Sequence, residues 1–512
     1  MIWQEIVKAA LIGTDRTQVS DSLKRTAESL GIDSELPPEK LLLQTAALLG
    51  QMQKAGSPAI QWTAPLPEPS AITAANVCSP KAARMLSRVL DGEYENLLPE
   101  FIQNLIDRQL FLPPEILPGI FQRALDHKEL AGSLPQIIGK RGHWLARLNP
   151  AWRVFSPQLP PEAWSEGLME ERIAFLRKLR QQQPAEARAL LEESWEQEGQ
   201  KERLRFLKVM EEELGPEDEA FLESCLDNRR KDLRKACAKL LARIPGSALV
   251  ERMTQRLGAL MEVQSRLLKK DKLQIQLPEA CDASMVRDGI DPRKQWAKGG
   301  VKASRFLQMM SLVPPTHWET SLQQSPDQLI ALFVRSEWST LLVQSILDAT
   351  CLHKDRHWMK ALLDFWLANF HKARWEELDL GPMLNVLPKD LYNEVLIEQL
   401  KDSVEYVEAD SPIAQLLRLD KHPWEDRLSM LFVKNLKQWI IGEQSRSWGQ
   451  WHLRELLKNA AFRTRPTLYD YFDKKWPRHD PVWSSWLDEV DDFLQVLRFR
   501  KRMLTVLDKP ES

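Results

Sequence analysis

Apolar residues along this chain recur every three or four positions, and this spacing predicts amphipathic α-helices over most of its length. One such row contains Ile173, Leu176 and Leu179, and a second row contains Leu204 and Leu207. Sustained alternation of apolar and polar residues, which would indicate β-strands, is nearly absent. The pattern therefore predicts an all-α fold.

A repeated pattern lies in the middle of the chain. The segment 171–177 matches the segment 202–208 at a spacing of 31 residues (202 minus 171), and a third copy begins near Asp232. The prolines that separate the two helices of each copy are Pro184, Pro216 and Pro245. A single helix pair cannot bury its apolar face alone, so such pairs stack on one another. The sequence predicts a HEAT-like helical-repeat α-solenoid across residues 166–272.

Two stretches interrupt the helical pattern and predict irregular loops. Residues 57–80 are rich in proline, and residues 273–300 contain prolines together with the pair Gly299-Gly300. The predicted division of the chain is 1–56 N-terminal helices, 57–80 a proline-rich connection, 81–165 a helical region, 166–272 the repeat array, 273–315 an irregular linker and 316–512 a tryptophan-rich helical region. Helices of this last region are expected at 327–348, 355–372, 388–403, 425–442, 449–461 and 481–506.

Composition narrows the class of protein. The chain has 70 basic and 72 acidic residues, so its net charge is only −2, which argues against a protein that mainly coats nucleic acid or an anionic membrane. Its five cysteines are scattered, as a reducing cytoplasm permits. We find no signal peptide or membrane span in the pattern and expect a cytoplasmic location.

Candidate chemical motifs are few. The glycine-basic clusters 139–142, which includes Arg141, and 298–300 can in principle hold anions, but neither follows a strand or fits a phosphate-binding loop. We expect each to be a helix C-cap followed by a turn. His353 and His357 are spaced to share one helical face, but Lys354 stands where a zinc protease has glutamate. The sequence predicts no catalytic residue, no metal site and no cofactor.

Charges separate strongly inside the repeat array. From Glu211 to Asp227 there are eight acids and no base, and from Asn228 to Arg243 there are seven bases and one acid. A basic helix of this kind can present a stripe to an acidic partner or to phosphates. The alternative, which we favour, is that the acidic second helix of one pair meets the basic first helix of the next. The candidate interaction surface consists of Arg229, Arg230, Lys231, Arg234, Lys235, Arg141, Trp448 and Trp451.

Tryptophan is abundant, and 13 of the 19 tryptophans lie from Trp296 onward. The pairs Trp448/Trp451 and Trp483/Trp486 are spaced to share a helical face. We expect most tryptophans to pack in the core and a few to be exposed as anchors for a partner. The basic segment 498–502 ends the last predicted helix, where positive charges favour the helix dipole.

Five segments together resemble a bacterial family of unknown function with HEAT-like repeats. They are residues 9–14, 139–152, 171–253, 286–290 and 312–318, in this order along most of the chain. The segment Ala303-Ser304-Arg305 departs from the family pattern, which has aromatic residues there. Genes of this family lie beside those of a MoxR-type AAA ATPase, a von Willebrand A-domain protein and a SWIM zinc-finger protein. The resemblance implies a helical-repeat fold and this genomic neighbourhood, and it implies no catalytic residues.

The expected function is protein–protein interaction, as a non-enzymatic scaffold or adaptor with a MoxR-type ATPase or a von Willebrand A-domain protein as expected partner. An extended helical surface would supply many weak contacts and a few aromatic or arginine anchors. The alternative is a nucleic-acid-binding or base-processing helical-repeat protein that uses the basic stripe.

Overall fold

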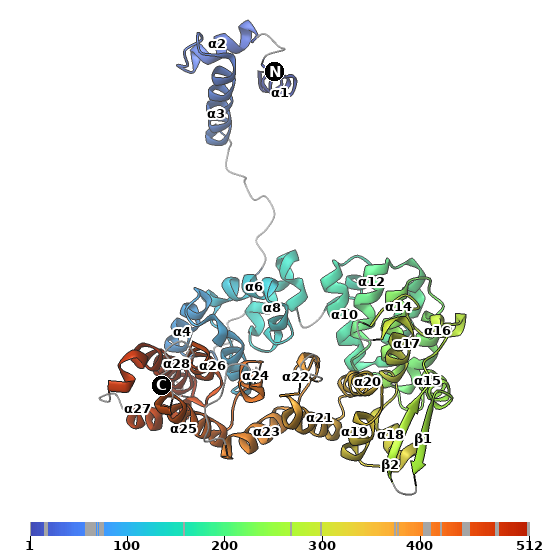
Figure 1. Cartoon of the computed structure of the whole chain (residues 1–512). Helices are drawn as coiled ribbons and strands as arrows, with labels where there is room; N and C mark the ends of the chain where they lie inside the picture. Colours follow the sequence, from blue (N-terminus) through green and yellow to red (C-terminus); the bar gives the residue numbers. More distant parts are fainter. Residues whose placement is uncertain are drawn as a thin grey trace. The chain divides into compact units, whose positions relative to one another are not determined.

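The computed structural model describes residues 2–14, 19–56, 68, 70, 76–156, 159–266, 269–296, 299–372, 375, 378–402, 411–419, 422–442, 451–476 and 481–508. These residues form 28 α-helices and one sheet of two strands, so the expected all-α class is confirmed with one small exception. The chain forms two compact units, the N-terminal unit Met1–Pro69 and the main unit Ser70–Ser512 (Figure 1). The expected proline-rich connection at 57–80 lies mostly outside the described residues.

The N-terminal unit contains three helices, α1 (Ile2–Ile12), α2 (Asp21–Ser29) and α3 (Pro38–Gly56). The hydroxyl of Ser20 caps α2 by accepting from the backbone N–H of Leu23, and it also donates to the carboxylate of Glu5 in α1. The buried apolar residues of the unit form two small clusters. They are Ile6, Leu23 and Leu42 in one cluster, and Ala27, Ile32 and Leu41 in the other.

The first part of the main unit is a layer of short helices around a separate core of buried side chains. Its α-helices are α4 (Pro80–Leu90), α5 (Leu98–Asp107), α6 (Leu117–Asp126), α7 (Lys128–Ala131) and α8 (Gly139–Leu148). Its 3-10 helices are η1 (Glu95–Leu97), η2 (Pro114–Ile116), η3 (Leu134–Gln136) and η4 (Pro150–Phe155). Prolines begin several of these helices, because the backbone N–H groups of the first turn have no acceptor within the helix and proline lacks this group.

A run of helices joined by short connections follows. The elements are α9 (Glu162–Ser165), α10 (Met169–Gln182), α11 (Pro184–Ser194), η5 (Trp195–Gln197), α12 (Gln200–Val209), η6 (Pro216–Asp218), α13 (Glu219–Cys225), α14 (Lys231–Arg243) and α15 (Ala248–Gly258). Helix α10 packs on α12, and α12 packs on α14. Pro184 and Pro216 stand at the first position of their helices as expected, whereas Ser247 and not Pro245 caps α15.

A β-hairpin after α15 was not expected from the sequence. Strands β1 (Met261–Arg266) and β2 (Lys269–Ile275) pair antiparallel, with Val263 opposite Leu273. Leu273 and Ile275 are buried, and β2 packs against a later helix of the chain, α19 (Pro326–Val334). Tertiary packing therefore fixes a strand whose own alternation is too short to predict it. The region 273–300, expected to be irregular, also contains the short helix α16 (Ala283–Arg287).

The rest of the chain is helical. Its elements are α17 (Gly300–Met310), α18 (Pro315–Leu322), α19, α20 (Ser339–His353), α21 (Arg356–Asn369), α22 (Gly381–Leu384), α23 (Lys389–Asp402), α24 (Pro412–Leu419), α25 (Asp426–Gly442), α26 (Trp451–Arg463), η7 (Pro466–Leu468), α27 (Tyr469–Lys475), η8 (Pro481–Trp486) and α28 (Leu487–Asp508). The helix expected at 327–348 divides into α19 and α20, and Ser336 accepts from the N–H of Trp338 in the break. Eleven tryptophans are buried among the residues that the structure describes, which confirms the expectation that most of them pack in the core.

The last helix of the chain packs on the first helices of the main unit. Helix α28 contacts α4 and α5, and Figure 1 shows α28 beside α4. Phe499, Met503 and Leu507 of α28 belong to the same core as the buried side chains of residues 78–155. One continuous core extends from the helices around α10 to α28, and η4 contacts α10, so the contacts of the main unit form a closed cycle.

Arg500 fixes this closure. Its side chain is 3% exposed, and its Nε and Nη2 donate to the two carboxylate oxygens of Glu100 at 2.7 and 2.9 Å. Its Nη1 donates to the carbonyl oxygens of Ala461 and Thr464. The basic segment 498–502 was expected to complement a helix dipole, but it stands inside α28 and Arg500 joins three parts of the chain.

Candidate functional site

The expected basic stripe on α14 is largely engaged within the protein. The ammonium groups of Lys231 and Lys235 lie 3.3 and 3.1 Å from Oδ2 of Asp291. Burial alone would raise the pKa of Asp291, but the N–H of Arg293 and these two lysines outweigh it and lower the pKa to about 2. Two cations of the stripe therefore hold the turn before α17.

The arginines of the stripe divide into structural and exposed residues. Arg234 donates to the carbonyl oxygens of Val286 and Asn228 at 2.8 and 2.7 Å, so it ties α14 to neighbouring turns. Arg230 is exposed beside Asp232, and Arg229 is exposed without an ion pair or hydrogen bond to any described residue. Of the five basic residues, these two are available to a partner.

The acidic segment 211–227 pairs with neighbouring helices, but mostly not with the bases that we expected. Arg243 of α14 contacts Glu211 at 3.4 Å, as the favoured interpretation predicts. The other described acids of this segment that make ion pairs do so with bases of other elements; for example, Arg177 contacts Glu212, and Arg287 contacts Asp227. The general interpretation as internal pairing is therefore right, and the specific pairing between α13 and α14 is wrong.

The most deeply buried of these pairs joins α10 to the turn before α13. Arg180 is fully buried, and its guanidinium binds both carboxylate oxygens of Asp218 and the carbonyl oxygens of Glu212 and Glu213. Burial alone would raise the pKa of Asp218, but hydrogen bonds from Arg180, the Gly215 N–H and Arg188 hold the pKa below its usual value. This pair is structural and offers no ligand site.

The aromatic candidates differ in what can be said of them. Trp451 begins α26 and is 58% exposed, so it is available as an anchor. Trp448 lies outside the described residues. Trp483 and Trp486, whose spacing is the same, are both buried in the core.

Both glycine-basic clusters begin helices, so the expectation of helix C-caps is wrong. Gly139 is the first residue of α8, and Gly299 precedes α17. A Cβ atom at Gly142 would lie 2.4 Å from Cβ of Ile138, which explains the need for glycine by packing. Arg141 is half-buried in α8 and makes no ion pair or hydrogen bond with the described residues.

The two histidines do not share a helix. His353 ends α20, Lys354 has a left-handed conformation with φ 54°, and α21 begins after it with Asp355 as its cap. His357 therefore stands on a different helix, and the expected common face is wrong. Among the described residues, no group of three or more His, Cys, Asp or Glu side chains is arranged to hold a metal ion.

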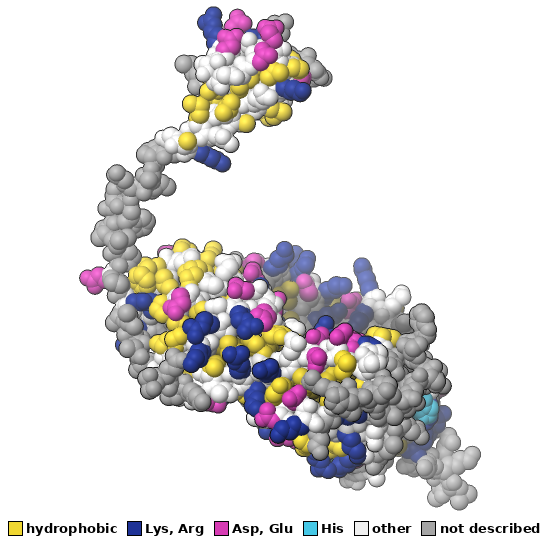
Figure 2. Space-filling view, turned by 90° about the vertical axis from the view of Figure 1, so that its left-hand side faces the viewer, with side chains coloured by type: hydrophobic (Ala, Val, Ile, Leu, Met, Phe, Trp, Pro, Cys, Tyr) yellow, Lys and Arg dark blue, Asp and Glu magenta, His cyan; other side chains and the backbone are white. Residues whose placement is uncertain are grey.

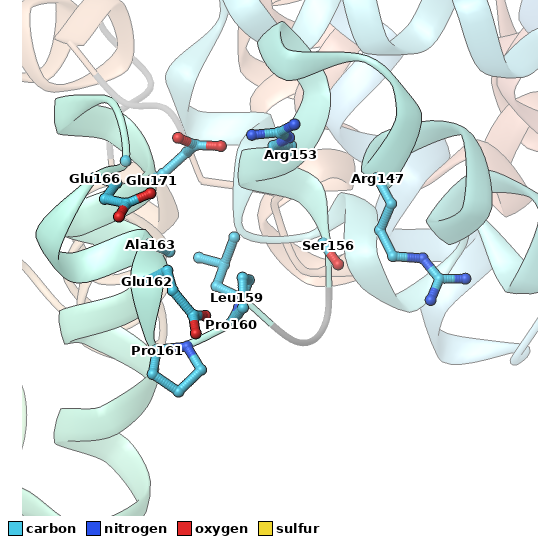
Figure 3. Close-up of a pocket in the computed structure, with 11 residues that line it drawn as sticks. Arg147, Arg153, Ser156, Leu159, Pro160, Pro161, Glu162, Ala163, Glu166 and Glu171 are labelled. Carbon is cyan, nitrogen blue, oxygen red and sulfur yellow. The ribbon is translucent and has the colours of Figure 1, made fainter. Parts of the chain in front are cut away.

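A cleft of about 790 Å³ lies between η4 and the segment around α9 (Figure 3). Glu166 and Glu171 stand on one wall and Arg153 faces them across the opening, while the guanidinium of Arg147 points away from them. Glu171 is buried, and its carboxylate accepts from the N–H of Leu168 at 2.8 Å. The cleft offers charges of both signs and no arrangement typical of a catalytic site.

Exposed apolar side chains concentrate on the N-terminal unit, where Figure 2 shows hydrophobic side chains gathered on one face. The described residues include thirteen large apolar residues that are exposed. Seven of them lie in α1 and α3: Trp3, Val7, Leu11, Ile12, Leu43, Leu48 and Met52. Trp3, Val7 and Leu11 are four residues apart and therefore form one row along α1. We call this row of three exposed residues, Trp3, Val7 and Leu11, the apolar face of the N-terminal unit.

Comparison with known proteins identifies a family. The sequence model of a family of unknown function, DUF5691, matches residues 5–507. The chain belongs to the DUF5691 family. No curated protein and no solved structure matches it.

The extent of the DUF5691 match has a structural meaning. It begins inside α1 and ends inside α28, so the family pattern includes both the N-terminal unit and the helix that closes the main unit. Within the described residues, no helix is both long and apolar enough to cross a membrane. The apolar face cannot be recognised in the sequence, because its row in α1 has the spacing of ordinary core positions. These residues differ from core residues only in that the N-terminal unit is too small to cover them.

Proposed function

We propose that this DUF5691 protein is a non-enzymatic interaction scaffold or adaptor whose N-terminal unit docks on another protein. The observation that supports the proposal is the apolar face, whose three residues belong to a part of the chain, α1 and α3, that holds seven of the thirteen exposed large apolar residues among those described. Exposed apolar residues gathered in one patch are typical of a surface that binds another protein.

The small core of the N-terminal unit favours the same function. Only six apolar residues are buried in its two clusters, and a unit of this size gains little stability from its core alone. A partner that covers Trp3, Val7 and Leu11 would add apolar burial and stabilise the folded unit. An apolar groove or an amphipathic helix of another protein has the chemistry to do so.

We further propose that the helix pairs of the main unit form a HEAT-like array that supports the docking unit. Their first helices begin at Met169, Gln200 and Lys231, so both spacings are 31 residues (200 minus 169, and 231 minus 200). Arginines stand at the same place in each first helix, and each binds oxygen atoms of neighbouring elements. They are Arg172, Arg203 and Arg234.

The proposed partners are a MoxR-type ATPase or a von Willebrand A-domain protein in the cytoplasm. This choice rests on the family resemblance and the neighbouring genes that it implies. A scaffold with many weak contacts and a few apolar anchors fits assembly beside such an ATPase.

The test is direct binding between the full-length chain and each purified candidate partner. We expect the double substitution V7E/L11E to weaken binding by at least about tenfold, because a buried carboxylate at each site would lack a partner. The control is L148E/L419E, which changes two exposed apolar residues of the main unit (45% and 52% exposed, against 42% and 82% for Val7 and Leu11). Equal binding by the wild-type protein and V7E/L11E would overturn the proposal.

Binding to nucleic acid is the outcome that would favour the other class. Among the five bases of the stripe, Arg229 has no described side-chain partner and Arg230 pairs only with Asp232 of the same segment, whereas Lys231, Lys235 and Arg234 bind other parts of the protein. Salt-dependent binding to duplex DNA that R229E/R230E abolishes, without any bound protein partner, would replace the scaffold by a nucleic-acid-binding protein.

A further inference from the structure

A second cavity lies where α14, α17 and α20 meet, together with the turn before α17 and the segment around α22. Its volume is about 530 Å³, within the usual range of sites for small molecules. Much of its wall is apolar. The apolar residues that line it include Ala238, Ile290, Leu307, Leu312, Leu352 and Val386.

Three lysines border this cavity. Lys235 and Lys239 stand one turn apart on α14, and Lys294 stands in the turn before α17. Lys235 is bound to Asp291, as described above. Lys239 and Lys294 are exposed, and the ammonium group of neither makes a hydrogen bond or an ion pair with a described residue. Two ammonium groups at the edge of an apolar cavity therefore lack an acceptor.

The one carboxyl group that lines the cavity does not serve as their acceptor. Asp348 of α20 accepts a hydrogen bond from Gln344 at 2.8 Å and makes no ion pair within 4 Å among the described residues. Burial raises the pKa of Asp348, although the nearby charges of Lys294 and Lys239 act in the opposite direction.

We propose that this cavity binds a small organic anion. Its carboxylate or phosphate group would accept hydrogen bonds from Lys239 and Lys294, and its apolar part would pack against side chains such as Leu307 and Leu352. Lysine suits either anion because its ammonium group acts as a point charge. The site is separate from the apolar face, so it adds a ligand to the proposed scaffold and does not depend on it.

The test is binding of benzoate and phenyl phosphate to the full-length chain, measured by titration calorimetry at constant ionic strength. We expect at least one of them to bind, and the double substitution K239Q/K294Q to weaken that binding by at least about tenfold. The matched control is K201Q/K389Q, which removes two exposed charges that do not line this cavity. Binding of only one probe identifies the anionic group that the site accepts.

Three outcomes would overturn the proposal. The first is that neither probe binds. The second is that K239Q/K294Q binds as well as the wild-type protein, or loses no more affinity than the control. The third is that inorganic phosphate binds as tightly as phenyl phosphate, since the apolar wall would then contribute nothing. Thermal unfolding of each variant checks that the fold is retained.

Discussion

Two buried arginines join distant parts of this protein at the residue scale. Arg180 and Arg500 are almost fully shielded from solvent, and each binds a carboxylate together with backbone carbonyl oxygens of other elements. Removal of one member of a buried pair leaves the other charge without compensation. These arginines therefore matter for stability far more than the exposed arginines beside them.

We expect R180A to lower the free energy of unfolding by about 3–5 kcal/mol, because Asp218 would remain buried without its main partner. The matched control is R177A, which removes an ion pair between Arg177 and Glu212 on the surface and should lower it by about 1 kcal/mol or less. Urea unfolding followed by circular dichroism measures both. A similar loss in the two variants would contradict the structural role of Arg180.

Asp291 predicts a dependence of stability on pH. Although burial opposes it, the Arg293 N–H and the two lysines lower the pKa of this carboxyl from 3.8 to about 2. Because the folded-state pKa is below the unfolded value, the ionised carboxylate stabilises the fold above about pH 4, and this stabilisation is lost as the pH falls toward 2. We expect D291N to lose less stability than the wild-type protein between these pH values. Urea midpoints at each pH test this, and identical slopes would refute it.

The sequence indicates which charges are paired but not with which partner. The sequence shows an acidic segment directly followed by a basic one, around α13 and α14. From this order one can infer that their charges form ion pairs within the protein. The partner of each side chain depends on how α16 and the turn before α17 fold back onto α14, which brings Asp291 to Lys231 and Lys235. These two contacts join residues that are 56 and 60 positions apart, so the spacing of residues within one helix cannot reveal them.

At the scale of elements, α28 connects the last helices of the main unit to its first helices. We expect R500A to increase amide hydrogen exchange in α4, α5 and α28 together, because Glu100 and two carbonyl groups lose their common donor. The control is R498A, since Arg498 is exposed on the same helix and makes no ion pair among the described residues. Faster exchange in α28 alone would show that α28 does not hold the first layer.

Most helices follow from the sequence, and their ends and breaks are less predictable. The expected helix at 355–372 corresponds to α21, and that at 425–442 corresponds to α25. The glycine pair at 299–300 has the composition of a helix end, yet Gly300 has φ 68° and begins α17. Glycine allows a left-handed conformation at either end of a helix, so its presence alone does not give the direction.

At the scale of the whole molecule, the two units have separate cores. We expect a chain without residues 1–69 to unfold within about 2 °C of the temperature of the main unit in the full chain, a shift that corresponds to less than about 1 kcal/mol. Differential scanning calorimetry of both chains measures it. A larger decrease would show that the main unit depends on the N-terminal unit for its stability.

The sequence predicts the helical class but not the cyclic order of contacts. A row of helix pairs and a closed cycle have the same periodic pattern, and they differ only in whether the last helix meets the first. Phe499 and Met503 fit any amphipathic helix equally well. Their packing on the layer of residues 78–155 becomes visible only in three dimensions.

This packing also sets an order of events during synthesis. Glu100 leaves the ribosome 400 residues before Arg500, and at about 5–20 residues per second this delay lasts about 20–80 s. Through that interval the nascent layer around Phe101 and Phe121 lacks the apolar side chains that complete it. We therefore expect the incomplete nascent chain to bind a chaperone that covers exposed apolar surface until translation ends.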